Sequence, residues 1–189
     1  MTRTLQTLAS LALAFGLTPL AETQSDIRIQ PELTEALAIS KRFADTLKPE
    51  LKSAMESGGP IAAVETCSER APQIASQLAS ETGWTVRRVS LQPRSPQATP
   101  DPWERQALRD LAQRAEAEDS SDTLVVSEAS DDAFRFMKAQ LVEPLCLVCH
   151  GKSIAPELER VLRRLYPNDE ATGYELGQIR GAISLSKAR

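Results

Sequence analysis

One short segment of the sequence has side chains that can attach and ligate a metal cofactor: Cys-Leu-Val-Cys-His at residues 146–150. Two thiols three residues apart lie on nearly the same side of one helical turn, so each can add to one vinyl group of a haem. The histidine after the second thiol then reaches the iron. The spacing predicts one covalent c-type haem, attached through Cys146 and Cys149, with His150 as an iron ligand.

The same cysteines allow two other interpretations. A Cys-x-x-Cys pair can form a structural disulfide or a thioredoxin-like redox pair, but no βαβ pattern precedes this one and the histidine is left unexplained. A zinc site of type Cys₃His would combine Cys67, Cys146, Cys149 and His150. Adjacent residues such as Cys149 and His150 rarely reach one tetrahedral ion together. Covalent haem is therefore the favoured interpretation.

The second axial ligand is less determined by the local pattern. His150 is the single histidine, so two histidines of one chain cannot ligate the iron. The candidates are Cys67, Met55, Met137, a lysine or an open face. Cys67 is the third, unpaired cysteine and lies on an apolar helical stripe, where a buried free thiol also occurs without any function. Spacing alone leaves these alternatives open.

The elements that must position these residues are mixed helices and strands. Apolar periodicity predicts helices over 31–57, 60–82, 102–118 and 156–165, with Gly58 and Gly59 separating the first two. Strands are expected over 84–91, 123–127, 134–142 and 178–185. Because no regular βαβ repeat is present, the order indicates an α+β fold with an antiparallel sheet and helices packed on it.

The first 21 residues read as a signal peptide, with basic Arg3, an apolar run from Leu8 to Leu20 and the small residue Ala21 at a plausible cleavage point. A retained membrane anchor is the alternative, although the run is shorter than the ~20 residues that a span needs. No later segment is apolar enough to cross a membrane. We therefore expect residues 22–189 to form one haem-binding domain in the periplasm, where haem c is attached.

The composition restricts the function further. The net charge is −4 and the basic residues form no long run, so a nucleic-acid partner is not expected. Aromatic residues make up only 4% of the chain, which favours a helix-rich core of aliphatic side chains.

Four segments together resemble a family of single-haem c-type proteins with a PAS-like fold, the Tll-type haem domain, formerly a domain of unknown function. They are CSERAPQIA from Cys67, RRVSLQPRSPQATPDPWERQAL from Arg87, EPLCLVCHG from Glu143 and YPNDEATGYELGQIRGAISLS from Tyr166. The resemblance implies a PAS-like α+β fold with the N-terminal helices on a central antiparallel sheet. It also implies that Cys67 binds the iron opposite His150. Ser95 departs from the family, which tends to have Asn there.

Three classes of function follow from a His/Cys-ligated haem. A redox or small-ligand sensor is favoured, because loss of Cys67 from the iron on reduction would open a site for a diatomic ligand. A low-potential electron carrier is the alternative, although no lysine cluster for docking is evident. An enzyme acting on a small molecule ranks last, since no second histidine offers acid–base chemistry. Arg87, Arg88 and Arg94 are candidates to face the haem propionates, although a solvated surface charge is the favoured interpretation of each one taken singly. The partner is expected to be a separate redox or signalling protein.

Overall fold

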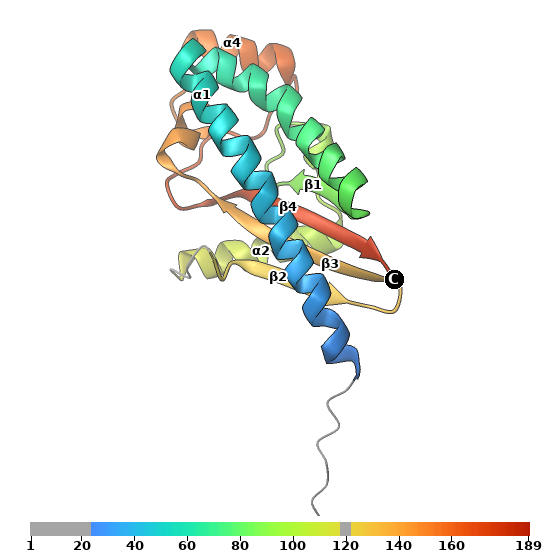
Figure 1. The fold of residues 1–189 in the computed structure, drawn as a ribbon. Coiled ribbons are helices and arrows are strands. Elements are labelled where there is room, and N and C mark those ends of the chain that lie inside the picture. Colours follow the sequence, from blue (N-terminus) through green and yellow to red (C-terminus); the bar gives the residue numbers. More distant parts are fainter. Residues whose placement is uncertain (1–23, 118–121) are drawn as a thin grey trace, which may run out of the picture.

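The chain folds into helices on both sides of an antiparallel sheet (Figure 1). Its structure is a computed structural model that describes residues 24–117 and 122–189, with side chains from residue 31 onward. The main elements are α1 (Gln24–Thr82), β1 (Thr85–Val89), α2 (Pro102–Glu116), β2 (Val125–Ala129), β3 (Ala133–Leu141), α3 (Leu147–His150), α4 (Pro156–Leu165) and β4 (Ile179–Ala188). Short 3₁₀ turns, η1 (Pro96–Ala98) and η2 (Pro144–Cys146), precede α2 and α3.

Helix α1 bends sharply at Gly59, so its two arms form an inverted V (Figure 1). Gly59 has φ 71° and ψ −167°, a conformation that side chains with a Cβ rarely adopt. Pro60 then opens the second arm, where the missing N–H costs nothing. The break expected at Gly58 and Gly59 is confirmed. Pro49, a second candidate for a kink, keeps helical dihedral angles.

The four strands pair in the order β1-β4-β3-β2, and every pairing is antiparallel. Central strand β4 places Ile183 opposite Arg88 on β1 and opposite Lys138 on β3. All four strands were predicted within a few residues, and the α+β fold with N-terminal helices on the sheet is confirmed. Strands β3 and β4, which pair with each other, therefore lie on either side of the Cys146–His150 turn in the sequence.

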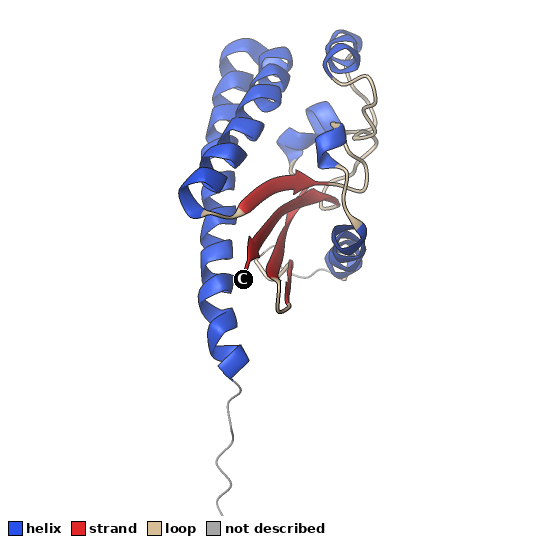
Figure 2. Ribbon diagram, turned by 90° about the vertical axis from the view of Figure 1, so that its right-hand side faces the viewer, coloured by secondary structure: helices blue, strands red, loops and turns tan. Residues whose placement is uncertain are grey.

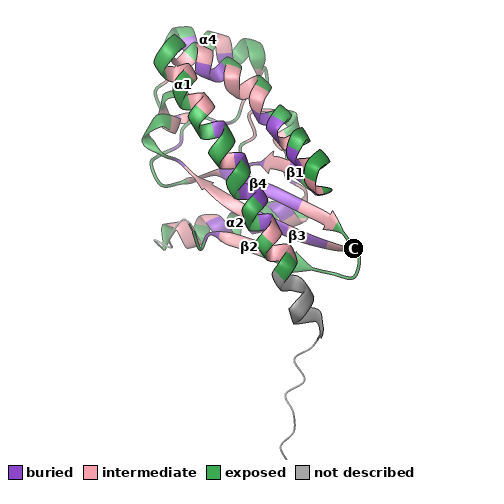
Figure 3. Cartoon of the chain, viewed as in Figure 1, coloured by how far each residue is buried: buried purple, intermediate pink, exposed green. Residues whose placement is uncertain are grey.

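Each face of the sheet buries its own apolar core (Figures 2 and 3). Helix α1 covers one face over a cluster that includes Trp84, Phe134, Phe136, Ile183 and Leu185. Helix α2 covers the other face over Val89, Leu108, Leu111, Met137 and Ala182. Because side chains alternate between the two faces along β3 and β4, neighbouring residues of these strands pack into opposite cores.

A buried carboxylate ties α2 to the sheet. Asp101 caps the helix by accepting from the Glu104 N–H at 2.8 Å, and Glu104 Oε2 accepts from the Asp101 N–H at 2.8 Å. Glu104 Oε1 also accepts from Ser184 Oγ on β4 at 2.7 Å. Arg135 completes the cluster with an ion pair to Asp101 at 2.5 Å. This capping box fixes the start of α2.

We expect Asp101→Ala to lower the free energy of unfolding by about 1–2 kcal/mol, since it removes the cap. Burial by itself raises the pKa of Asp101, but hydrogen bonds from the Glu104 N–H and from Arg135 outweigh it and hold that pKa below its ordinary value. Such a carboxylate stabilises the fold above its unfolded pKa, and that contribution disappears as pH falls through the lowered folded value. Denaturant titration at neutral pH and below pH ~3 checks this. A difference between wild type and variant that persists undiminished in acid contradicts it.

The predicted signal peptide, residues 1–21, lies outside the described residues. Within residues 24–117 and 122–189, no helix is both long and apolar enough to cross a membrane.

Candidate functional site

The Cys-x-x-Cys-His segment forms one helical turn, as its spacing predicts. Cys146 has helical dihedral angles, φ −65° and ψ −32°, and α3 follows from Leu147 to His150. Gly151 ends the turn, because its N–H donates to Leu147 O at 2.9 Å and a Cβ at this position would lie 2.5 Å from the same oxygen. Only glycine fits so close to the preceding turn.

The loop between α4 and β4 clamps this turn through its backbone. Gly173 N donates to Gly151 O at 3.0 Å, and Tyr174 N donates to His150 O at 3.0 Å. Arg94 reaches the turn from the loop after β1, donating to Cys149 O at 2.6 Å and to Ala171 O at 3.2 Å. Three segments distant in sequence thus hold the histidine and the thiols in place.

The hydrogen bond of His150 leaves one ring nitrogen available as a ligand. Its Nδ1 lies 2.7 Å from Ala171 O. Because a carbonyl only accepts, Nδ1 carries the proton and Nε2 keeps its lone pair. Burial, followed by the charges of Arg180 and Arg94, lowers the pKa of His150 to about 2. A neutral imidazole with an oriented Nδ1–H is the form that metal-binding histidines take.

Arg180 points its Nε–H at the face of the same ring. Its Nε lies 3.1 Å from His150 Nδ1 and 3.4 Å from Nε2. An atom this near to both nitrogens cannot lie in the ring plane without overlapping the carbon between them, so it lies above the plane. The in-plane lone pair of Nε2 therefore stays free for a metal.

The three thiols gather around the histidine turn. Cys149 packs against Val64 of α1 and Leu158 of α4. Cys67, also on α1, is close enough for its charge to act on Cys149 and to be acted on by Cys146. Burial raises the pKa of Cys67, with Arg88, Arg94 and Arg180 acting in the opposite direction. Burial also raises the pKa of Cys149 to about 11. Cys67 of α1 thus lies near the two thiols of the attachment motif.

The arginines that the sequence singled out have different surroundings. Arg87 donates to Thr99 O at 2.6 Å and lies near Glu104, so it belongs to the α2 cluster. Arg94 pairs with Asp169, Nε to Oδ2 at 3.0 Å, and both side chains are almost buried. Arg88 approaches Gln140 and acts on Cys67. Sequence reasoning missed Asp169 and Arg180, which no short motif marks.

The alternative interpretations of the cysteines find no support in the described residues. Cys67, Cys146 and Cys149 are all free thiols. No group of three or more His, Cys, Asp or Glu side chains in these residues converges as zinc ligands would. Among the rival axial ligands, Met137 is fully buried in the core under α2. The assignment of Cys67 and His150 to iron stays a prediction.

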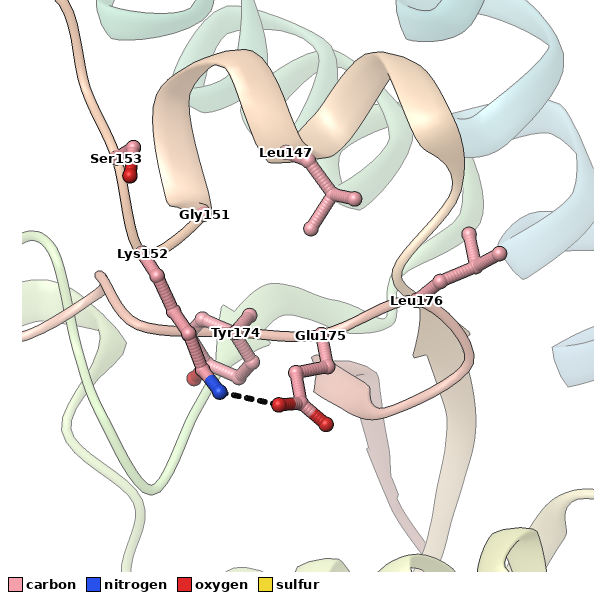
Figure 4. Close-up of a pocket in the computed structure, with 7 residues that line it drawn as sticks. All are labelled: Leu147, Gly151, Lys152, Ser153, Tyr174, Glu175 and Leu176. Carbon is pink, nitrogen blue, oxygen red and sulfur yellow. Dashed lines mark hydrogen bonds and ion pairs between the residues drawn. The ribbon is translucent and has the colours of Figure 1, made fainter.

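An open pocket lies against one side of the histidine turn (Figure 4). Leu147 and Tyr174 line it, and the ion pair of Lys152 with Glu175 lies in front of Tyr174. Neither the two predicted iron ligands nor the two attachment thiols line this pocket, so it adjoins the site without containing it.

The fold and site define an α+β domain in which an N-terminal helical hairpin and the loop between β3 and β4 bring three thiols and one imidazole together. A family model described as Tll0287-like matches residues 20–187, and the chain belongs to that family. The fold is similar to that of the crystal structure of the cyanobacterial heme-protein Tll0287, with a TM-score of 0.63 and 21% sequence identity. That match covers 86% of this chain and 96% of the other. No curated protein matches the sequence.

Proposed function

We propose that the chain is a periplasmic haem c protein, with the cofactor attached through Cys146 and Cys149 and its iron ligated by His150 and Cys67, and that it senses redox state or a small ligand. The observation that carries the proposal is the hydrogen bond from His150 Nδ1 to Ala171 O, 2.7 Å long, in the turn that presents both thiols. It leaves Nε2 as a ready ligand. The similar haem protein and the family support a haem cofactor.

The residues fit such a group by charge as well as by ligand type. Arg88 and Arg180 act on the site, and neither has a carboxylate within ion-pair distance among residues 31–117 and 122–189. Anionic propionates and a thiolate would balance them. When bound, the haem supplies a one-electron couple and an iron that takes diatomic ligands.

Sensing is favoured over simple electron transfer by where the two ligands lie. Cys67 is on the second arm of α1, whereas His150 is on α3. Release of Cys67 on reduction would therefore free the helical hairpin from the haem turn, and a partner protein could detect that change. A low-potential electron carrier remains the alternative, and it needs ligands that stay bound in both states.

Carbon monoxide distinguishes the sensor from the carrier. We expect no spectral change with the ferric protein and a new ferrous band when carbon monoxide is added after reduction, because the thiolate leaves the less positive iron. Absorption spectra under anaerobic titration measure both states. A reduced protein that ignores carbon monoxide supports the carrier and contradicts sensing by ligand exchange.

A further inference from the structure

The side chain of Arg180 is held in place by partners that carry no negative charge. Its Nη1 donates to Ser90 Oγ at 2.9 Å, and its guanidinium lies over the Tyr174 ring, 5.4 Å from the centroid. Ser90 and Tyr174 are both buried. No ion pair joins Arg180 to a carboxylate among the described residues, where Asp169 is engaged by Arg94. A cation in such a place is costly unless negative charge is nearby.

The position of this cation relative to His150 is equally specific. The guanidinium directs its Nε–H at the imidazole face, and leaves both the Nδ1–H bond to Ala171 O and the in-plane Nε2 lone pair undisturbed. Arg180 thus contacts a predicted iron ligand without competing for the metal. Strand β4 carries it at the irregularity between the Gly181 and Ile179 pairs with β3, and its carbonyl accepts from Ser90 Oγ at 2.8 Å.

A fixed cation next to an iron ligand acts on the equilibrium between ferric and ferrous iron. Each electron added to the centre adds one negative charge, which a nearby positive charge stabilises, and partial burial weakens the screening by water. A thiolate ligand acts in the opposite direction, because it stabilises the ferric state.

We propose that Arg180 is a positioning residue that raises the reduction potential of the centre, offsetting the thiolate of Cys67, while the contact of its Nε–H with the ring face holds His150. The proposal rests on the proposed function, since it requires haem at His150. Its content is electrostatic: the charge of Arg180, and not its bulk alone, sets the potential.

Arg180→Met, Arg180→Gln and Arg180→Lys separate charge from bulk. We expect Met and Gln to shift the ferric/ferrous equilibrium at least tenfold toward ferric iron, a fall of about 59 mV or more in midpoint potential. Lys keeps the charge and should stay within about threefold of wild type. Spectroelectrochemical titration of the purified haem proteins measures this, with Arg42→Met, which removes an exposed cation paired with Glu81, as the unshifted control.

Two readouts keep this test separate from that of the proposed function. A haem stain of denatured wild type reports attachment, and absence of haem there defeats the proposed function. Equal midpoint potentials of haem-loaded wild type and Arg180→Met contradict the role of Arg180 and leave the proposed function standing. The same holds if the midpoint of Arg180→Lys shifts as far as that of Arg180→Met. If neither neutral variant retains haem, Ser90→Ala decides, because it removes the 2.9 Å anchor that holds the charge of Arg180 beside His150. It should lower the midpoint beyond the Arg42→Met control, and an unchanged midpoint contradicts the proposal.

Discussion

We expect the double variant Cys146→Ala/Cys149→Ala, produced in a cytochrome c-competent periplasm, to carry no covalently bound haem. The two thiols lie on one helical turn and are both free, so they are available for thioether bonds. Wild-type haem should stay with the polypeptide through denaturation and acidic organic extraction. Haem staining of denatured protein measures the difference, and wild-type haem that leaves with the solvent contradicts covalent attachment.

The same variant should be less stable than the loaded protein. Haem adds a large apolar plate to a chain with only 4% aromatic residues. Losing about 100 Å² of apolar contact costs roughly 2 kcal/mol or more, which is ~4–8 °C in melting temperature for a chain of this size. Leu145→Ala/Val148→Ala trims two half-exposed side chains of the same segment but keeps both thiols, so it serves as the matched control. Equal melting temperatures for haem-free variant and haem-loaded wild type would rule out a structural role of the cofactor.

The fold was predictable from sequence because its signals are local. Glycine at 58 and 59 marks the bend of α1, and Asp101 with Pro102 marks the start of α2. Period-two patterns located the strands. The pairing order of the strands was not predictable in this way, because β4 joins β1 across about half the chain and no local signal encodes that contact.

The site was predictable only where a motif carries it. Motif spacing predicts Cys146, Cys149 and His150 as candidate site residues, and resemblance to a family predicts Cys67. Arg180 and Asp169 act through tertiary contacts: Arg180 points its Nε–H at His150 from β4, and Asp169 binds Arg94 from a loop. An arginine on a strand and an aspartate in a loop look like ordinary surface charges until the fold brings the first to the imidazole and the second to Arg94.

Cys67→Ala is expected to convert the ferric centre from low-spin to high-spin and to open it to added ligands. Cys67 is the free thiol outside the attachment motif, lies on α1 beside Cys149 and is within electrostatic reach of Cys146 and three arginines. Burial raises its pKa, so the haem-free thiol is protonated at neutral pH and must release its proton to bind iron. Without the thiolate, the midpoint potential should rise, because the ferric state loses its stabilising charge.

Ferric absorption spectra with and without cyanide or imidazole measure the opened face, and Cys67→Ser tests whether an oxygen of similar size can replace the sulfur. Ser68→Ala, on the same helical turn, removes hydrogen bonds to Glu65 O and Tyr166 but no thiol, and should keep the wild-type spectrum. Met55→Leu tests the remaining methionine rival and should also be silent, since a thioether ligand would raise the potential rather than lower it. If Cys67→Ala and Cys67→Ser both keep the low-spin spectrum and midpoint of wild type, Cys67 is a packing residue and the iron's second ligand lies elsewhere.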